Sequence, residues 1–182
     1  MTQLRGDGHV HLADYTAPAW RIPQVELQFE LDPAATVVAS RLCLSPDPAR
    51  PGQPLVLDGE GLELLDISLD GQPLAPERYD YDGHRLVVRG LSGDCELATR
   101  VRIHPADNTR LEGLYRSGQL LLTQCEAQGF RRITFMADRP DVMPRWRIVL
   151  RANRDAFPVL LANGNPLASQ DLGDGRHEAS WE

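Results

Sequence analysis

The sequence predicts an all-β fold, an antiparallel β-sandwich of many short strands with little or no long helix. Three Asp-Gly pairs, Asp58-Gly59, Asp70-Gly71 and Asp82-Gly83, recur at intervals of 12 residues between short apolar segments. Asp-Gly supplies the positive φ of tight hairpin turns, so this spacing favours antiparallel sheets over βαβ units. No window of a dozen residues shows the apolar spacing of an amphipathic helix.

Period-two alternation of apolar and polar residues predicts the first strands. From Ile22 through Leu31 the apolar residues alternate with Glu and Gln, as in a half-buried strand. Asp32-Pro33 then turns the chain, and a second alternating strand covers residues 38–44 before a proline-rich loop.

Further short strands are expected along the rest of the chain, at residues 55–57, 62–69, 85–89, 96–103, 146–152, 157–162, 166–170 and 176–181. Residues 1–20 lack periodicity and are expected to form an N-terminal arm, which leaves residues 21–182 as a single sandwich domain. His9 and His11 flank Val10 in the arm. This spacing suits two metal ligands on one side of a strand, but no third ligand lies nearby in the sequence.

Composition limits the class of protein. A chain of 182 residues with 42% hydrophobic content is long enough for a real core. The net charge of −7 argues against a nucleic-acid binder, and no apolar run is long enough to span a bilayer. The N-terminus has no apolar segment typical of a signal peptide, so we expect a cytoplasmic protein. Three widely spaced cysteines fit reduced thiols better than disulfides or a zinc knuckle.

Two patterns suggest catalysis and are weak. His177-Glu178 begins the sequence HEASW, in which Trp181 stands where the zinc motif H-E-x-x-H needs its second histidine. The segment also reads as a strand, and residues four apart in a strand are about 13 Å apart. Cys125 and His104 could be a thiol nucleophile and its base, although a lone cysteine between strands is more often a small buried hydrophobe.

Residues 108–142 hold the remaining candidate site. Gln124 and Glu126 follow an apolar strand, and a rigidly held carboxylate beside an amide can accept hydrogen bonds from an ammonium group. The alternative is that Glu126 is a solvated charge or a partner of Arg131 or Arg132.

Arg139 and Asp141 flank Pro140 a little further along the same stretch. They either form a turn that orients the Glu126 loop, since Pro fixes φ and Arg–carboxylate pairs are directional, or form an ordinary surface turn with a screened ion pair.

The segments NTRLEGLYRSG, TQCEAQGFRRIT and DRPDV occur in this order, with HLADYTAPAW near the start and LLANGN near the end. Together they resemble the N-terminal domain of the bacterial aminopeptidase N family, zinc metallopeptidases of the M1 family, over nearly the whole chain. The resemblance implies a saddle-shaped β-sandwich that packs on a thermolysin-like catalytic domain. It also implies that the loop glutamate, Glu126, binds the free α-amine of the substrate together with a second glutamate from the catalytic domain's Gly-x-Met-Glu-Asn motif. Gln124 would line the first side-chain pocket.

The family's zinc motif and its transition-state tyrosine lie beyond the matched region. The resemblance therefore implies a domain truncated before its catalytic domain, with no catalytic residue, metal ligand or cofactor of its own, and with zinc in the catalytic domain of the parent enzyme. Its partners would be the catalytic and C-terminal domains of the same polypeptide and the peptide substrate, without nucleic acid or membrane. By itself the chain should hydrolyse nothing. The alternative is a free-standing sandwich that binds a protein or a glycan, for which 6% aromatic residues offer little stacking surface.

Overall fold

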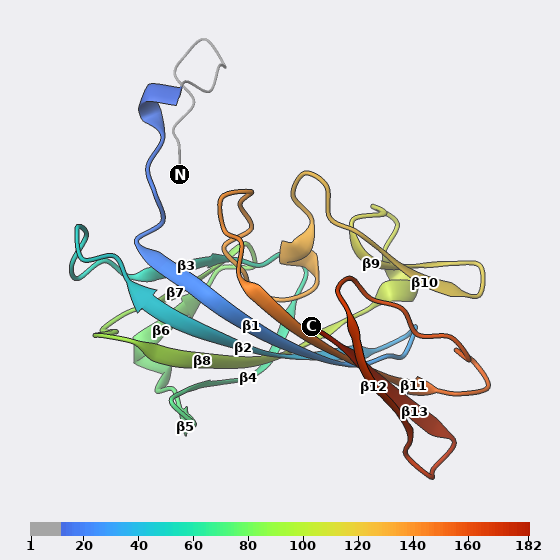
Figure 1. Ribbon diagram of the computed structural model, residues 1–182. Coiled ribbons are helices and arrows are strands. Elements are labelled where there is room, and N and C mark those ends of the chain that lie inside the picture. The colour runs from blue at the N-terminus through green and yellow to red at the C-terminus, as the bar shows by residue number, and fades with distance from the viewer. Residues whose placement is uncertain (1–11) are drawn as a thin grey trace.

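The computed structural model describes residues 12–182, so the His9 and His11 pair lies outside the described residues. In this range the chain forms short strands and four 3₁₀ helices of three residues each, which confirms the all-β prediction (Figure 1). Within it, no helix has the length and apolar character needed to cross a membrane. The 3₁₀ helices are η1 (Leu12–Asp14), η2 (Pro76–Arg78), η3 (Pro105–Asp107) and η4 (Phe130–Arg132). The strands are β1 (Trp20–Glu30), β2 (Thr36–Pro46), β3 (Leu55–Asp58), β4 (Glu63–Leu69), β5 (Gln72–Pro73), β6 (Tyr79–Tyr81), β7 (Arg85–Val88), β8 (Cys95–Ile103), β9 (Gly113–Ser117), β10 (Leu120–Gln124), β11 (Arg145–Asn153), β12 (Pro166–Asp171) and β13 (Arg176–Trp181).

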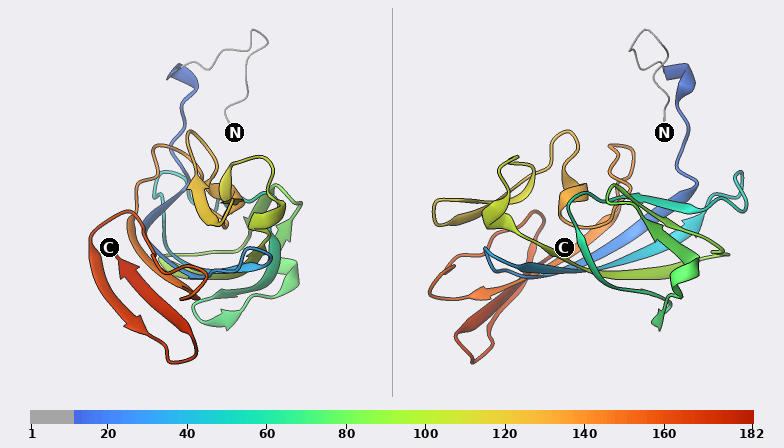
Figure 2. Two further views of the ribbon diagram at one scale, coloured as in Figure 1. Left: turned by 90° about the vertical axis from the view of Figure 1, so that its right-hand side faces the viewer. Right: turned by 180° about the vertical axis from the view of Figure 1, so that it is seen from behind.

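The largest sheet has eight strands in the order β12-β13-β11-β1-β2-β8-β4-β5. It twists strongly along its length, as the two views of Figure 2 show. Its neighbours pair antiparallel except for β1 and β11, which run parallel from Gln24↔Arg145 to Glu30↔Arg151. This pair is the exception to the antiparallel pairing expected from the sequence, which the other strand pairs follow. Residues 31–144 separate β1 from β11, and a connection of that length permits parallel pairing.

A second layer covers one face of the large sheet. It consists of the three-stranded sheet β3-β7-β6, the hairpin β9-β10 and the segment after η4. The core lies between the layers. On β1 the inward residues Val25, Leu27 and Phe29 are at most 6% exposed, whereas Glu26 between them is partly exposed. The period-two pattern therefore predicted correctly which residues of this strand are buried. The structure confirms the sandwich.

Two of the three Asp-Gly pairs form the expected turns. Asp70 and Gly71, between β4 and β5, have φ values of 50° and 75°, and Gly83, between β6 and β7, has φ 87°. The prediction is wrong for Asp58-Gly59, because β3 pairs with β7 rather than with β4. A Cβ on Gly59 would lie 2.4 Å from the Phe135 ring, so glycine is required there for close packing and not for a hairpin.

The strand expected at residues 157–162 is also absent from the structure. The chain forms a loop there, with Val159 and Leu161 exposed. Asn153 Oδ1 accepts hydrogen bonds from the backbone N–H groups of Asp155 and Ala156, which turns the chain away from the sheet. Pro158 then offers no N–H for a ladder, so apolar alternation alone could not produce a strand.

The N-terminal segment is fastened to the sandwich before β1 begins. The Tyr15 hydroxyl donates to Asp141 Oδ2 at 2.9 Å, and Arg139 Nη2 donates to the Thr16 carbonyl at 2.9 Å. Arg139 also holds Asp141 through two hydrogen bonds, of 2.9 and 2.7 Å, and its guanidinium lies 5.9 Å from the centre of the Tyr15 ring. The predicted Arg139–Asp141 turn is therefore formed. Its contacts bind the arm, and none of them reaches Glu126.

The hydrogen bonds that Arg139 and Asp141 make with Tyr15 and Thr16 give a first prediction. Replacing Asp141 by asparagine should expose the arm to chymotrypsin at Tyr15 in limited proteolysis followed by mass spectrometry, because the hydroxyl loses a charged acceptor and Arg139 loses its bidentate partner. The free energy of unfolding should fall by no more than about 1 kcal/mol, since the pair is partly solvated. Asp174→Asn is the matched control, because Asp174 pairs with Arg176 at the same sequence spacing elsewhere. Equal cleavage in both variants would contradict the prediction.

Candidate functional site

The candidate site is the loop of residues 125–129, which joins β10 to η4. Both ends are anchored. Gln124 pairs with Gly113 at the end of the β9-β10 hairpin, and the Phe130 ring packs on Trp146 of β11 with 5.0 Å between ring centres. The loop thus leaves and re-enters the domain at fixed points.

Two glycines bring the limbs of this loop together. A Cβ on Gly129 would lie 2.8 Å from the Gln124 carbonyl oxygen, and a Cβ on Gly113 would lie 2.7 Å from the Arg132 Cβ. Gly113 also has a φ of 71°, which favours glycine. The return limb of the loop can therefore lie directly against the hairpin only because neither position carries a side chain. The peptide bond between Glu126 and Ala127 is cis.

Gln124 and Glu126 are both exposed to solvent. Among residues 12–182, the Glu126 carboxylate accepts no hydrogen bond and forms no ion pair. A cavity of about 260 Å³ opens elsewhere on the second layer, lined in part by Glu60, Arg132 and His104, and neither Gln124 nor Glu126 reaches it. The described residues thus present Gln124 at the end of β10 and Glu126 on the loop, both outside this cavity.

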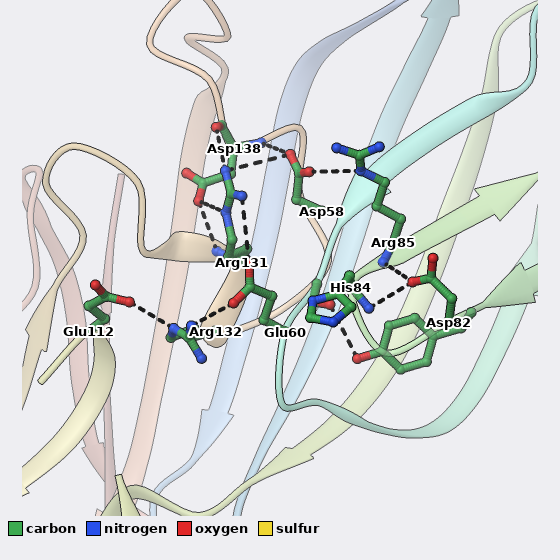
Figure 3. Close-up of polar contacts among 11 residues, drawn as sticks. Asp58, Glu60, Asp82, His84, Arg85, Glu112, Arg131, Arg132 and Asp138 are labelled. Atoms are coloured by element: carbon green, nitrogen blue, oxygen red, sulfur yellow. Dashed lines mark hydrogen bonds and ion pairs between the residues drawn. The ribbon is translucent and has the colours of Figure 1, made fainter. Parts of the chain in front are cut away.

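The alternative partners of Glu126 are engaged elsewhere, as Figure 3 shows. Arg131 Nε donates to Asp138 Oδ2 at 2.8 Å, and its two terminal nitrogens lie 3.9 Å from Asp58 and 3.8 Å from Glu60. Arg132 binds Glu60 through Nη2 and Glu112 through Nε. The structure therefore excludes both arginines as the partner of Glu126.

The arginine at the centre of this network is held firmly in its charged form. Partial burial by itself would lower the pKa of Arg131, but the hydrogen bond to Asp138 and the charges of Asp58, Asp138 and Glu60 outweigh it and raise the pKa. Sequence reasoning missed this network. Asp58 and Glu60 come from the end of β3, some seventy residues before Arg131, and no local spacing in the sequence links them.

The structure does not favour Cys125 as a nucleophile. Desolvation by burial, with a smaller contribution from Asp138, raises the pKa of its thiol to about 11, so the thiol is protonated at neutral pH. His104 Nδ1 lies 2.6 Å from the Ala34 carbonyl oxygen, and no contact within residues 12–182 joins it to Cys125. The packing interpretation of this cysteine is the one the structure supports.

His177 and Glu178 lie in β13, as predicted, and not in a helix. His177 is buried with Nε2 2.7 Å from the Phe157 carbonyl oxygen, and the Glu178 carboxylate binds Arg151 and Gln170. Nowhere in residues 12–182 do three His, Cys, Asp or Glu side chains gather as metal ligands. Within the described part of the chain, His177 and Glu178 therefore belong to no set of side chains that fits a zinc ion.

Comparisons with known proteins agree on one family. Residues 26–182 match the family model of the peptidase M1 N-terminal domain. The chain is 44% identical over 172 residues to aminopeptidase N of Caulobacter vibrioides, covering 94% of this chain and 20% of that protein. It is 39% identical over 169 residues to aminopeptidase N of Escherichia coli, covering 93% of this chain and 19% of that one. The chain thus spans about a fifth of the length of these relatives.

Solved structures show the same fold. The crystal structure of Legionella pneumophila aminopeptidase A in complex with aspartic acid superposes with a TM-score of 0.86 and 27% identity, covering 93% of this chain and 20% of that chain. A mutant M1 zinc metallopeptidase of Deinococcus radiodurans bound to a Tyr-Ser-Ala substrate gives a TM-score of 0.72 at 14% identity, covering 90% of this chain and 39% of that chain. The second similarity concerns the fold alone.

Proposed function

The chain belongs to the peptidase M1 N-terminal domain family, and from this premise we propose that it is the non-catalytic N-terminal part of a longer zinc aminopeptidase. Its task there is to supply Glu126 as a carboxylate that recognises the free α-amine of a peptide substrate, with Gln124 beside it as a wall of the pocket for the first side chain. In this proposal residues 21–182 are a single β-sandwich domain, and residues 1–20 are an N-terminal arm that precedes it.

One observation carries the proposal. Glu126 is exposed on an anchored loop, and within residues 12–182 its carboxylate has no partner, so it is available to accept hydrogen bonds from a ligand. An aminopeptidase must distinguish a chain terminus from an internal peptide bond, and the terminus carries an ammonium group with a pKa near 8. A carboxylate in a site closed off from water attracts that cation and disfavours a neutral amide.

The rest of the enzyme must come from the remainder of the polypeptide. Met143 and Leu161 are 86% and 80% exposed, and Leu120 on β10 is 61% exposed. In this proposal the catalytic and C-terminal domains of the same polypeptide pack on this domain and cover part of this apolar surface. The described residues offer no zinc site, so zinc would be bound by that remainder. The three free cysteines fit a reducing compartment, in keeping with a cytoplasmic enzyme.

The test compares the full-length polypeptide with residues 1–182 on an aminoacyl-anilide, with zinc measured in both. The full-length protein should cleave the anilide and hold zinc, and the fragment should do neither. Stoichiometric zinc or anilide cleavage in the fragment would overturn the proposal. So would a full-length protein, loaded with zinc, that cleaves internal peptide bonds as readily as terminal ones.

A further inference from the structure

The Glu126 loop owes its position to groups other than Glu126 itself. The carboxylate has no contact within residues 12–182, so nothing at the tip of the loop holds it in place. Its orientation must come from the two limbs. The limb on the β10 side is held by strand pairing with β9, and the return limb runs through η4.

The return limb is fastened by the ion network of Figure 3. Besides its side-chain contacts, Arg131 donates its backbone N–H to Asp138 Oδ2 at 3.3 Å, and its carbonyl accepts the Glu60 N–H at 2.8 Å. Asp138 in turn donates its N–H to Asp58 Oδ2 at 3.3 Å. Backbone and side chain of the same arginine are thus fixed to two separate segments, the end of β3 and the segment that follows η4.

These contacts are shielded from water. The Asp138 side chain is only 9% exposed, and the Arg131 and Arg132 side chains are 19% and 17% exposed. Charge-assisted hydrogen bonds in such an environment are short, directional and weakly screened. Arg132 extends the network to Glu112, just before β9, and so ties the return limb to the strand that pairs with β10.

We propose that Arg131 and Asp138 are positioning residues for Glu126, which they serve by fixing the return limb of the 125–129 loop against β3. This inference rests on the proposed function. It goes beyond it by assigning to a largely buried ion pair, which makes no contact with Glu126, control over how well the free amine is recognised. Because the pair acts through Glu126, its contribution should disappear when Glu126 no longer carries a charge.

The test is a double-mutant cycle in the full-length enzyme with Asp138→Asn and Glu126→Gln, assayed on an aminoacyl-anilide. Asp138→Asn should raise KM about fivefold and leave kcat within about twofold, as expected for a loss of uniform binding. The double variant should have the KM of Glu126→Gln alone, because residues that act as a unit are not additive. Arg131→Lys keeps the positive charge but loses the planar guanidinium that binds several acceptors at once, so it should behave like Asp138→Asn. Arg131→Lys therefore provides a second variant if asparagine impairs folding.

Glu178→Gln is the matched control. Glu178 is likewise a largely buried carboxylate paired with an arginine, Arg151, but it lies in β13. It should lower the melting temperature without changing KM by more than about twofold. An unchanged KM in Glu126→Gln would overturn the proposed function, and the positioning inference with it. If Glu126→Gln raises KM but both network variants leave it unchanged, or if Asp138→Asn adds its full factor in the double variant, only the positioning inference is overturned.

Discussion

Replacing Phe135 by alanine is expected to lower the free energy of unfolding by about 3–5 kcal/mol. Phe135 is completely buried, and its ring meets that of Tyr81 edge to face with 4.9 Å between ring centres. It stands in the segment after η4, against the backbone of Gly59 at the end of β3. The ring therefore joins the segment that follows the candidate site to the three-stranded sheet. Urea denaturation followed by circular dichroism measures the effect.

A second substitution makes this result specific. Gly59→Ala alone should destabilise the protein by about 1–3 kcal/mol, because the new methyl group would lie 2.4 Å from the ring. In the Phe135→Ala background the same methyl group has space, so the double variant should be more stable than the sum of the two losses predicts. Leu120→Ala, at a side chain 61% exposed, should change stability by no more than about 0.5 kcal/mol. Additive losses at Gly59 and Phe135 would contradict the packing described here.

The sequence predicted the fold well where buried and solvated residues alternate along a strand. The strands β1, β2 and β8 each have one buried and one solvated face, so alternation in the sequence reported them directly. The failures at Asp58-Gly59 and at residues 157–162 have different causes, and neither is visible in the alternation of apolar and polar residues. In both, a tertiary partner or a local turn decides the conformation: the Phe135 ring above Gly59, and the turn around Asn153 before Pro158.

For the candidate site, too, the sequence predicted the local features and missed contacts between distant segments. Resemblance to a family could point to Glu126 and Gln124, because they lie in one short motif. Asp58 could not be linked to Arg131 and Asp138 from the sequence, because the fold brings together the end of β3, η4 and the segment that follows η4. The pairing of Arg139 with Asp141 was predictable from their spacing around Pro140, but its use in holding Tyr15 was not.

Replacing Glu126 by glutamine in the full-length enzyme is expected to reduce kcat/KM on an aminoacyl-anilide at least about thirtyfold. Removing one partner of a desolvated charge pair costs about 2–5 kcal/mol, and 1.4 kcal/mol corresponds to a factor of ten. Glutamine keeps the size of the side chain and one acceptor oxygen, so the loss reports the charge. Zinc content should be unchanged. Glu77→Gln, an exposed glutamate on η2, serves as the control and should behave as wild type.

The pH dependence separates amine recognition from a general loss of activity. In the wild-type enzyme kcat/KM should fall as the pH rises through about 8, because the substrate ammonium loses its proton and with it the attraction to the carboxylate. In Glu126→Gln this fall should be much shallower, since a neutral amide distinguishes less between the charged and the neutral amine. The two profiles should therefore converge at high pH. Parallel profiles, displaced by a constant factor at every pH, would mean that Glu126 supports activity in some other way than by binding the amine.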